Sequence, residues 1–310
     1  SLNAAGVRTL RPVEVVDWTA EEGVTFKPML GSRIFTGALP LDEAYSLTDP
    51  DGRTLKESLE AIQYLGDRPF FPANVHAYFE LHIEQGPVLE HQGRQIGAVT
   101  GAVGQRWYDL VIRGQETHAG PCPMSLRRDA LMGAAEIALL ARQIASADSD
   151  GRATVGMLSV SPGSRNVVPG KIEMTVDLRH PDAGLLSKFD QQFRSASADL
   201  AARCRLEIEI TERVQIPAIR FHPLLVERVR SAARSMGANY ADIVSGAGHD
   251  ACNLALALPT TMIFIPCKDG LSHNAAESAT PEDVAMGCCV LAQAVLATAN
   301  DAFALEPKAA

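Results

Sequence analysis

The sequence predicts an α/β protein in which one domain is interrupted by a second, smaller one. Apolar runs typical of strands alternate with stretches in which apolar residues recur every three or four positions. Between residues 105 and 214 the expected order is β-α-β-β-α-β, the ferredoxin-like arrangement. Elements of both kinds continue on either side. We therefore expect a discontinuous domain of residues 1–104 and 215–310, and an inserted domain of residues 105–214.

Each element is expected from its local pattern. Short apolar or alternating runs bounded by Gly, Pro or Asn predict strands, in chain order at residues 12–19, 76–83, 96–100, 107–113, 153–160, 171–178, 205–212 and 260–266. Longer stretches with a period of three to four predict helices, at residues 41–65, 123–146, 181–204, 223–236, 250–258 and 282–299. Pro281 suits the first position of the last helix.

Composition narrows the class of protein. The 310 residues carry a formal net charge of −9, which argues against the clustered Lys and Arg that nucleic-acid binding needs. We expect no membrane segment, because no apolar run approaches the ~18 residues that would span a bilayer. The six cysteines form no C-x-x-C pair and are interpreted as buried thiols of a reducing compartment. A cytoplasmic protein is therefore expected.

Two adjacent carboxylates, Glu21 and Glu22, follow directly after the first expected strand. The carboxyl edge of a strand is where open α/β sheets place their chemistry. Because adjacent carboxylates repel, a pair held in a pocket needs a nearby cation. A metal ion bound by one carboxylate leaves the other free to act as a base. The alternative is a solvated loop, the commoner setting of a bare Glu-Glu pair.

The expected strand at 76–83 carries ionisable residues on one face. Because strand side chains alternate, Glu80, His82 and Glu84 share that face. Histidine beside carboxylates suits a zinc ligand with supporting hydrogen bonds, and an exposed strand is the alternative. His273 lies in a loop after the strand at 260–266, where a ligand would be placed, although most loop histidines have no such role. Any metal site must be assembled from distant segments, since no local H-E-x-x-H pattern exists.

Four further polar residues have suggestive positions, and two of them, His249 and Arg179, suit the binding of a substrate carboxylate. His118 follows a strand of the inserted domain, and His249 lies at a Gly-rich turn entering a helix, whose N-terminus favours anions. Asn166 and Arg179 flank the hairpin of the inserted domain, and Arg179 has the geometry to clamp a carboxylate with two hydrogen bonds. The alternatives are turn histidines bonded to the backbone and a surface arginine.

Eight short stretches occur in one order along the chain. They are W-T-A-E-E-G, E-L-H-I-E-Q-G-P-V-L-E, G-Q-R-W-Y, T-H-A-G-P-x-P-M, R-N-V-V-P-G, D-L-R-H-P-D, G-A-G-H-D-A and L-S-H-N-A-A-E. This series closely resembles the hydantoinase/carbamoylase family of dinuclear-metal amidohydrolases, a branch of the aminoacylase-like metallopeptidases. The family includes N-carbamoyl-L-amino-acid hydrolases, β-ureidopropionases and allantoate amidohydrolases.

The resemblance implies an aminoacylase-like catalytic domain interrupted by a ferredoxin-like dimerisation domain. It implies that Glu22, His82 and His273 are metal ligands. Glu21 would be the general base, and His118 would act in catalysis from the partner subunit of a homodimer.

Four residues would bind the substrate by the same resemblance: Gln85, Asn166, Arg179 and His249. The implied substrate is a small N-carbamoyl or ureido carboxylate, such as an N-carbamoyl-L-amino acid, N-carbamoyl-β-alanine or allantoate. The implied cofactors are two divalent ions per subunit, Zn, Mn or Co, which activate a water for attack on the ureido carbonyl. Glu21 would take the proton of that water. The expected products are ammonia, carbon dioxide and an amine.

One departure from the family pattern leads to a second hypothesis. Members carry a His and a bridging Asp upstream of the E-E-G segment, and no such segment precedes Glu21 here. We therefore expect the N-terminal part of the catalytic domain to be missing, and the chain to bind at most one ion weakly. The alternative function is a catalytically silent, dimerising protein that retains the carboxylate-binding residues Arg179, Asn166 and His118.

Overall fold

The computed structural model describes residues 4–66, 75–302 and 305. It divides the chain into two compact units. Unit 1 comprises Ser1–Ala102 and Arg220–Ala310, and unit 2 comprises Val103–Ile219. Both units combine helices and strands, which confirms the predicted α/β class. The division falls a few residues from the expected bounds of the inserted domain, 105 and 214.

A five-stranded sheet forms the centre of unit 1. Its order is β1-β12-β2-β10, with β11 also paired to β2. The first two strands run parallel, β12 and β2 run antiparallel, and β11 runs parallel to β2. The bounds are β1 Tyr78–Ile83, β2 Ile96–Ala102, β10 Ile219–Arg220, β11 Tyr240–Ser245 and β12 Thr260–Ile265.

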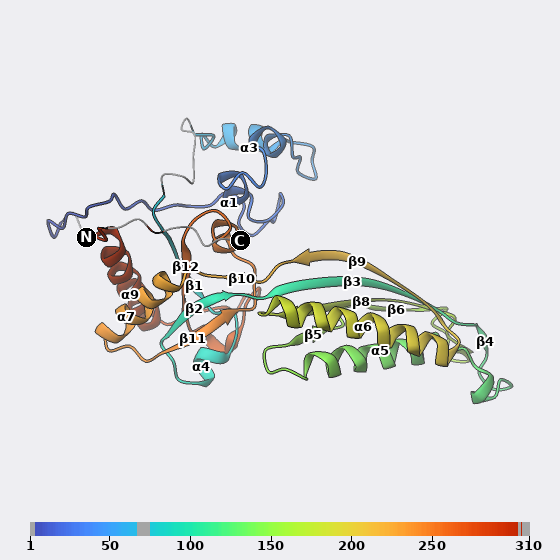
Figure 1. The fold of residues 1–310 in the computed structure, drawn as a ribbon. Helices are drawn as coiled ribbons and strands as arrows, with labels where there is room; N and C mark the ends of the chain where they lie inside the picture. The colour runs from blue at the N-terminus through green and yellow to red at the C-terminus, as the bar shows by residue number, and fades with distance from the viewer. Residues whose placement is uncertain (1–3, 67–74, 303–304, 306–310) are drawn as a thin grey trace. The chain divides into compact units, whose positions relative to one another are not determined.

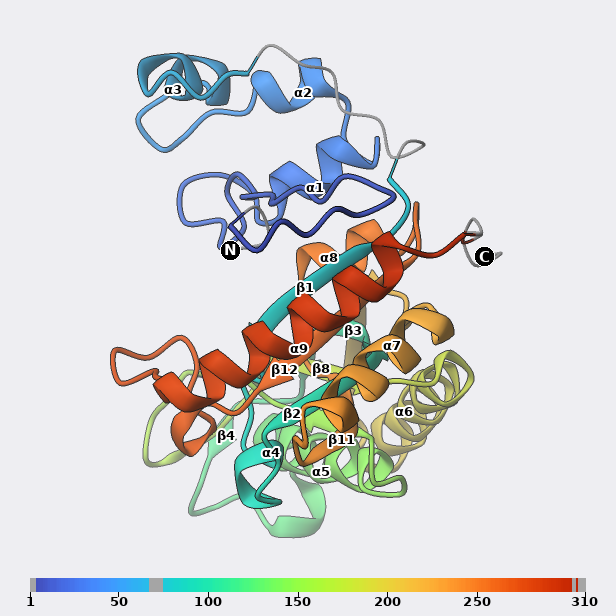
Figure 2. The ribbon, with the colours of Figure 1, turned by 90° about the vertical axis from the view of Figure 1, so that its left-hand side faces the viewer.

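Helices cover this sheet (Figure 2). Helices α7 (Pro223–Ser235) and α9 (Pro281–Ala299) contact each other and the strands β2 and β12. Gly287 of α9 allows a close approach, because a Cβ there would lie 2.7 Å from Ile265 and 2.9 Å from Leu81. Leu81 therefore points toward α9. Since side chains alternate along a strand, Glu80 and His82 point to the opposite face.

The short helix α8 (Asp250–Leu254) contacts β1 and β12. It also contacts α1 (Leu30–Phe35), in which Leu30 anchors a small apolar cluster with Leu39, Ala44 and Leu55. The remaining short helices are α2 Leu41–Tyr45, α3 Leu55–Ala61 and α4 Val88–His91. The site described below is built around β1, α8, which contacts it, and α1, which contacts α8.

Unit 2 is a sheet with two helices on one face (Figure 1). The strand order β5-β8-β3-β9, with β6 also paired to β8, is antiparallel throughout. This is the expected ferredoxin-like arrangement. The bounds are β3 Gly104–Arg113, β5 Arg152–Thr154, β6 Leu158–Ser161, β8 Lys171–His180, β9 Glu207–Ile216, α5 Ala130–Ala145 and α6 Ala183–Cys204. A two-stranded ribbon, β4 Thr117–His118 with β7 Val167–Val168, extends from it.

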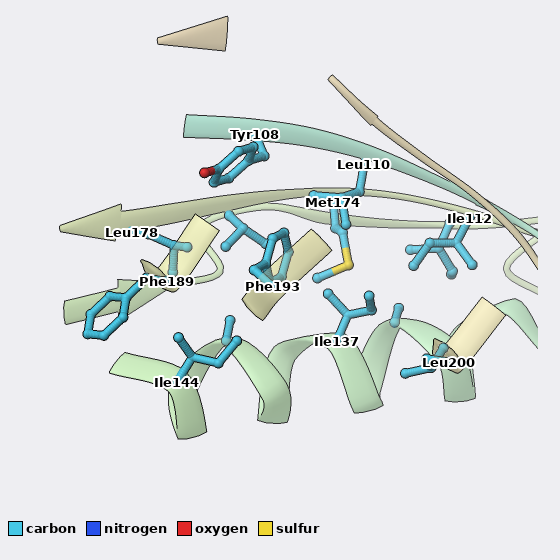
Figure 3. Packing of buried hydrophobic residues seen from close by; sticks show 14 of the residues in the cluster. Tyr108, Leu110, Ile112, Ile137, Ile144, Met174, Leu178, Phe189, Phe193 and Leu200 are labelled. Carbon is cyan, nitrogen blue, oxygen red and sulfur yellow. The ribbon is translucent and has the colours of Figure 1, made fainter. Parts of the chain in front are cut away.

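The core of unit 2 is aliphatic with a few aromatic side chains (Figure 3). Residues of β3 and β8, such as Leu110 and Met174, meet Ile137 of α5 and Phe193 of α6. Each of these four side chains is at most 1% exposed. The alternation of buried and half-buried residues along β8 matches the pattern that predicted this strand.

Several expectations are wrong in detail. The strand expected at 12–19 is absent from the described residues, where Val15 is 99% exposed. A strand needs hydrogen bonds from a neighbouring strand, and this segment pairs with none that is described. The helix expected at 123–146 begins only at Ala130, after a 3-10 turn at Met124–Leu126. The strand expected at 153–160 is divided into β5 and β6, and the expectation missed β11, α1 and α4.

Two expectations about composition also need correction. All six cysteines are free, but only Cys267 is buried and Cys288 and Cys289 are exposed. The helix α9 is long and apolar enough to cross a membrane by length and composition, so such a run does exist. One such helix is weak evidence for a membrane, and α9 packs on α7 and on the strands of unit 1.

Candidate active site

The imidazole of His82 on β1 is oriented by a hydrogen bond to the backbone of the next residue. Its Nδ1 lies 2.8 Å from the carbonyl oxygen of Ile83. A carbonyl oxygen only accepts hydrogen bonds, so Nδ1 carries the proton and donates it. In the neutral ring Nε2 then holds the free lone pair. A metal-binding histidine is held in the same way, by a hydrogen bond from its other ring nitrogen.

His249 packs directly against His82. Their ring centroids are 4.7 Å apart, and Phe264 of β12 lies against both rings. His249 is only 1% exposed, and its Nε2 lies 2.8 Å from the hydroxyl of Ser245. Burial, aided by the neighbouring His82, lowers the pKa of His249 to about 3. The ring is therefore neutral at physiological pH.

Glu80 lies on the same face of β1 and is largely buried. Its Oε2 accepts hydrogen bonds from the hydroxyl of Tyr78, at 2.8 Å, and from the backbone N–H of Ala251, at 3.0 Å. Its Oε1 lies 3.9 Å from Nδ1 of His249. Burial raises the pKa of Glu80 to about 7, because desolvation outweighs these hydrogen bonds.

The loop that carries Glu21 and Glu22 is held by α1. The N–H of Met29 donates to the carbonyl of Glu21, and the N–H of Gly31 donates to that of Thr19, both at 3.0 Å. Burial raises the pKa of Glu21, and the charges of Glu22 and Asp250 raise it further, while His82 and His273 lower it. Glu21 is therefore within electrostatic range of all four of these side chains.

His273 approaches this loop from the segment after β12. Its Nε2 lies 3.8 Å from Oε2 of Glu22, and both side chains are exposed. The backbone N–H of His273 donates to Glu277 at 3.1 Å. Ring contacts and electrostatic interactions thus link five side chains of unit 1: Glu21, Glu22, His82, His249 and His273.

The donors fit a divalent cation in type and charge. Imidazole nitrogens and carboxylate oxygens are ligands that zinc takes. Asp250 is 2% exposed, and its Oδ1 has no hydrogen-bond partner, so negative charge is concentrated where a cation would relieve it. Within the part of the chain that the structure describes, however, no three His, Cys, Asp or Glu side chains are grouped closely enough to hold a metal ion.

Uncommon backbone conformations occur beside these residues. Four residues that are not glycine have positive φ angles in this region: Ala20 (55°), Met29 (54°), Gln85 (58°) and His273 (53°). A left-handed conformation costs free energy for such residues, and strained residues cluster at active sites; Gln63, Arg205 and Asp269 also adopt it. Ala20 directly precedes Glu21, and Met29 donates to it.

Gln85 and Glu84 follow His82 at the end of β1, but they have different environments. The amide oxygen of Gln85 is buried and has no hydrogen-bond partner, so it can accept an N–H from a bound molecule. Glu84 was expected to share the ionisable face. Instead its two oxygens accept from the N–H groups of Val88 and Leu89, at 2.8 and 2.7 Å, and cap α4.

In unit 2 the expected site residues fall at opposite ends. His118 and Asn166 are exposed neighbours, linked by a 2.9 Å hydrogen bond from the N–H of Ala119 to the carbonyl of Asn166. They lie beside β4, beyond the start of β8 (Figure 1). Arg179 lies near the other end of β8, eight residues from Lys171, or about 26 Å at the usual rise. Its guanidinium donates twice to Asp177, at 2.9 and 2.7 Å.

Sequence reasoning missed three residues that the structure places in this site: Trp18, Tyr78 and Asp250. The alternation that selected Glu80 and His82 also places Tyr78 on their face, so this residue was open to prediction. Trp18 and Asp250 come from segments distant in sequence. Only the packing of α1 on α8, and of α8 on β1, brings them near.

The fold and these side chains resemble those of the aminoacylase-like metallopeptidases, and comparison with known proteins agrees. Residues 1–297 match the Peptidase family M20/M25/M40. The chain belongs to this family.

Individual relatives narrow the comparison. The chain is 41% identical to the N-carbamoyl-L-amino-acid amidohydrolase of Rhizobium meliloti, covering 97% of this chain and 73% of the relative. It is 36% identical to the allantoate amidohydrolase of Escherichia coli K12, covering 91% and 70%. A crystal structure of a hydantoinase/carbamoylase family amidase from Burkholderia multivorans superposes with a TM-score of 0.94 at 47% identity, covering 97% of this chain and 74% of that one. The predicted resemblance is confirmed, and the names of these relatives support the prediction of an amidohydrolase.

Proposed function

We propose that this chain hydrolyses the C–N bond of a linear ureido or amide group, with an N-carbamoyl amino acid or allantoate as the substrate and Glu21 as the general base. The observation that carries the proposal is the environment of Glu21. This carboxyl is half-buried, its pKa is raised, and His82 and His273 lie within electrostatic range. A base with a raised pKa is better matched to proton transfer near neutral pH.

The reaction needs a nucleophile, a base and a route for the proton. Glu21 accepts a proton from the attacking water and returns it to the leaving nitrogen as the C–N bond breaks. The products are ammonia and a carbamate, which decomposes to carbon dioxide and the amine. Glu22, His82 and His273 are the side chains that would hold a divalent ion. Such an ion, when bound, lowers the pKa of water and polarises the carbonyl oxygen.

We further propose that His118 and Asn166 act in the site of a partner subunit. Both are exposed and lie about one strand length from Arg179 in the same chain. The substrate-binding residues that we propose beside these two are Gln85, Arg179 and His249. The buried, unpartnered oxygen of Gln85 supports a contact with a substrate N–H. The six free cysteines support a reducing location such as the cytoplasm.

The test of the base is Glu21→Gln. Ammonia release is measured with N-carbamoyl-L-amino acids, N-carbamoyl-β-alanine and allantoate, after incubation with Zn²⁺, Mn²⁺ or Co²⁺. Loss of a general base lowers kcat by about 10²–10⁴-fold. Glu14→Gln, at an exposed position in the preceding segment, is the matched control and retains activity. Activity retained by Glu21→Gln contradicts the assigned base.

The partner contribution is tested by mixing two inactive variants, Glu21→Gln and His118→Ala. In a heterodimer that shares His118 across the interface, one site has both changes and the other has neither. Random exchange at equal amounts then restores about a quarter of the wild-type activity. No recovery, with heterodimers verified by mass, contradicts the shared site.

The silent-protein hypothesis predicts a different result. A wild type that binds N-carbamoyl amino acids but releases no ammonia with any of the three ions supports a carboxylate-binding protein.

A further inference from the structure

A chain of hydrogen bonds passes through the candidate site. The indole Nε1 of Trp18 donates to the hydroxyl of Tyr78, at 2.9 Å. That hydroxyl donates to Oε2 of Glu80, at 2.8 Å. The same oxygen accepts the backbone N–H of Ala251, at 3.0 Å. Every donor in the chain therefore has an acceptor, and the hydroxyl of Tyr78 is used in both senses.

This network of hydrogen bonds joins three segments of the protein that are distant in sequence. Trp18 precedes Glu21 by three residues in the loop that carries Glu21 and Glu22, here called the carboxylate loop. Glu80 precedes His82 by two residues on β1. Ala251 follows His249 by two residues in α8. Each segment that this network joins thus carries one residue of the candidate site, and the three segments are linked through the Tyr78 hydroxyl and one oxygen of Glu80.

We propose that Trp18, Tyr78 and Glu80 are positioning residues that hold Glu21, His82 and His249 in their working arrangement. This inference rests on the proposed function, because that function requires Glu21 and His82 to act together. None of the three positioning residues needs to touch the substrate. Hydrogen bonds made directly to metal ligands change metal affinity and activity about 10–100-fold when removed, and the bonds of this network act one step further out, on the segments that carry the ligands.

The carboxylate loop has a second, independent attachment. The backbone bonds from Met29 and Gly31 hold it to α1, and the Trp18 ring packs edge-on against Phe35 with centroids 5.5 Å apart. These contacts hold the loop on α1 without linking it to β1. Removal of the Tyr78 hydroxyl leaves them in place. The loop then stays folded and keeps the ring contact of Trp18 with Tyr78, whose centroids are 6.2 Å apart, but it loses the hydrogen bond that fixes its position relative to His82.

The first test breaks this network at two points: Tyr78→Phe removes both hydrogen bonds of the hydroxyl with little change in volume, and Trp18→Phe removes one hydrogen bond together with part of the ring. Tyr78→Phe and Trp18→Phe are compared with wild type, with the double variant, and with Tyr240→Phe. The last variant removes a hydroxyl that accepts from Arg234 at 2.8 Å in the same unit and takes no part in this hydrogen-bond network. The measurements are kcat and KM for ammonia release, Zn²⁺ affinity by calorimetry, and thermal unfolding.

We expect Tyr78→Phe and Trp18→Phe each to lower kcat and Zn²⁺ affinity about tenfold, with KM nearly unchanged. The double variant is expected to be no worse than the more impaired single variant, because both changes break the same chain. The control keeps wild-type kcat and Zn²⁺ affinity. Wild-type kcat and Zn²⁺ affinity in both single variants overturn the inference, as does a loss that parallels only a fall in thermal stability.

The second test separates geometry from charge at Glu80. The amide oxygen in Glu80→Gln can still accept from Tyr78 and Ala251, whereas Glu80→Leu has no acceptor. A positioning role predicts that Glu80→Gln rescues most of the kcat and Zn²⁺ affinity that Glu80→Leu loses. Equal loss in both variants overturns the positioning role, because the charge of Glu80 is then what matters.

Failure of the inference is distinguishable from failure of the proposed function. A wild type that binds Zn²⁺ with the expected dependence on Tyr78 but hydrolyses none of the substrates overturns only the proposed function. A wild type that hydrolyses a substrate, with Tyr78→Phe and Trp18→Phe equally active and equally tight for Zn²⁺, overturns only the positioning role.

Discussion

His249 shows how far the behaviour of one residue depends on its burial. Its sequence context, a Gly-rich turn before a helix, suggested an imidazole available to a substrate. In the structure the ring is enclosed by His82, Phe264 and Ser245. Burial disfavours the charged ring and therefore lowers the pKa of His249. Pairing with a carboxylate would shift the pKa of a histidine in the opposite direction, upward. Any contact with substrate is therefore made by a neutral ring.

This burial predicts a pH dependence of stability in the metal-free protein. The folded pKa of His249, about 3, is below the unfolded value of about 6.5. Between these pH values the unfolded chain binds more protons, so stability falls as pH falls. Glu80, with a folded pKa of about 7, has the opposite effect above about pH 4.5. The contribution of His249 is therefore clearest between pH 4.5 and 3.

We expect His249→Gln to reduce the loss of stability over this window, by about 1 kcal/mol. Denaturant unfolding of the chelator-treated protein at pH 4.5 and 3.5 measures the effect. The exposed His91→Gln serves as the control. An identical pH slope in wild type and His249→Gln would falsify the assignment of a neutral, buried ring.

The prediction of individual site residues from sequence succeeded where local geometry determines orientation. Alternation along β1 placed Glu80 and His82 on one face, and the structure does so. Glu84 lies just beyond the end of β1, and its carboxylate caps α4, a contact that the alternation did not predict. Two further contacts could not be predicted, since Ala251 reaches Glu80, and Trp18 reaches Tyr78, only through tertiary packing.

Helix starts illustrate the same point for whole elements. The helix expected from residue 123 begins at Ala130 because Asp129 supplies the cap. Its Oδ1 accepts from the N–H groups of Leu131 and Met132, at 3.0 and 3.2 Å. Capping by Asp is a sequence-readable signal, and it was overlooked in favour of the longer apolar pattern.

We expect Asp129→Ala to lower the free energy of unfolding by about 1 kcal/mol. The two amides at the start of α5 then lose their acceptor, while the core side of the helix is unchanged. Denaturant unfolding measures the effect, with the exposed Asp150→Ala as the control. A change no larger than that of the control would show that water replaces the cap without cost.

The expected strand at 12–19 failed for a reason that no local pattern contains. Its apolar residues suit a strand, but strand formation depends on a partner that supplies hydrogen bonds. The described structure provides none, and Val13, Val15 and Val16 remain exposed. The strands of unit 2 were easier to predict, because each pairs with a neighbour inside the same 117-residue unit, Val103–Ile219.

At the scale of the whole molecule, the two units differ in how their cores are made. The hydrophobic core of unit 2 is drawn entirely from residues between Tyr108 and Leu206. Unit 1 is assembled from two separated stretches of chain, and its sheet pairs β1 and β2 with β11 and β12. The candidate metal ligands all come from unit 1. Unit 2 holds His118, Asn166 and Arg179, for which we propose roles toward the substrate.

This organisation predicts that residues 103–219 fold without the rest of the chain. The ends of the fragment meet, because Gln105 of β3 pairs with Ile216 of β9, so excision breaks no strand pair of its sheet. We expect cooperative unfolding with a single transition, followed by circular dichroism.

Phe193→Ala is expected to destabilise the fragment by about 3–5 kcal/mol, because its ring is fully buried. The exposed Leu139→Ala, on α5, is the control for loss of an apolar side chain. The fragment is also expected to bind no Zn²⁺ specifically, since Glu22, His82 and His273 lie outside it. A fragment that unfolds without cooperativity would show that unit 2 depends on unit 1 for its fold.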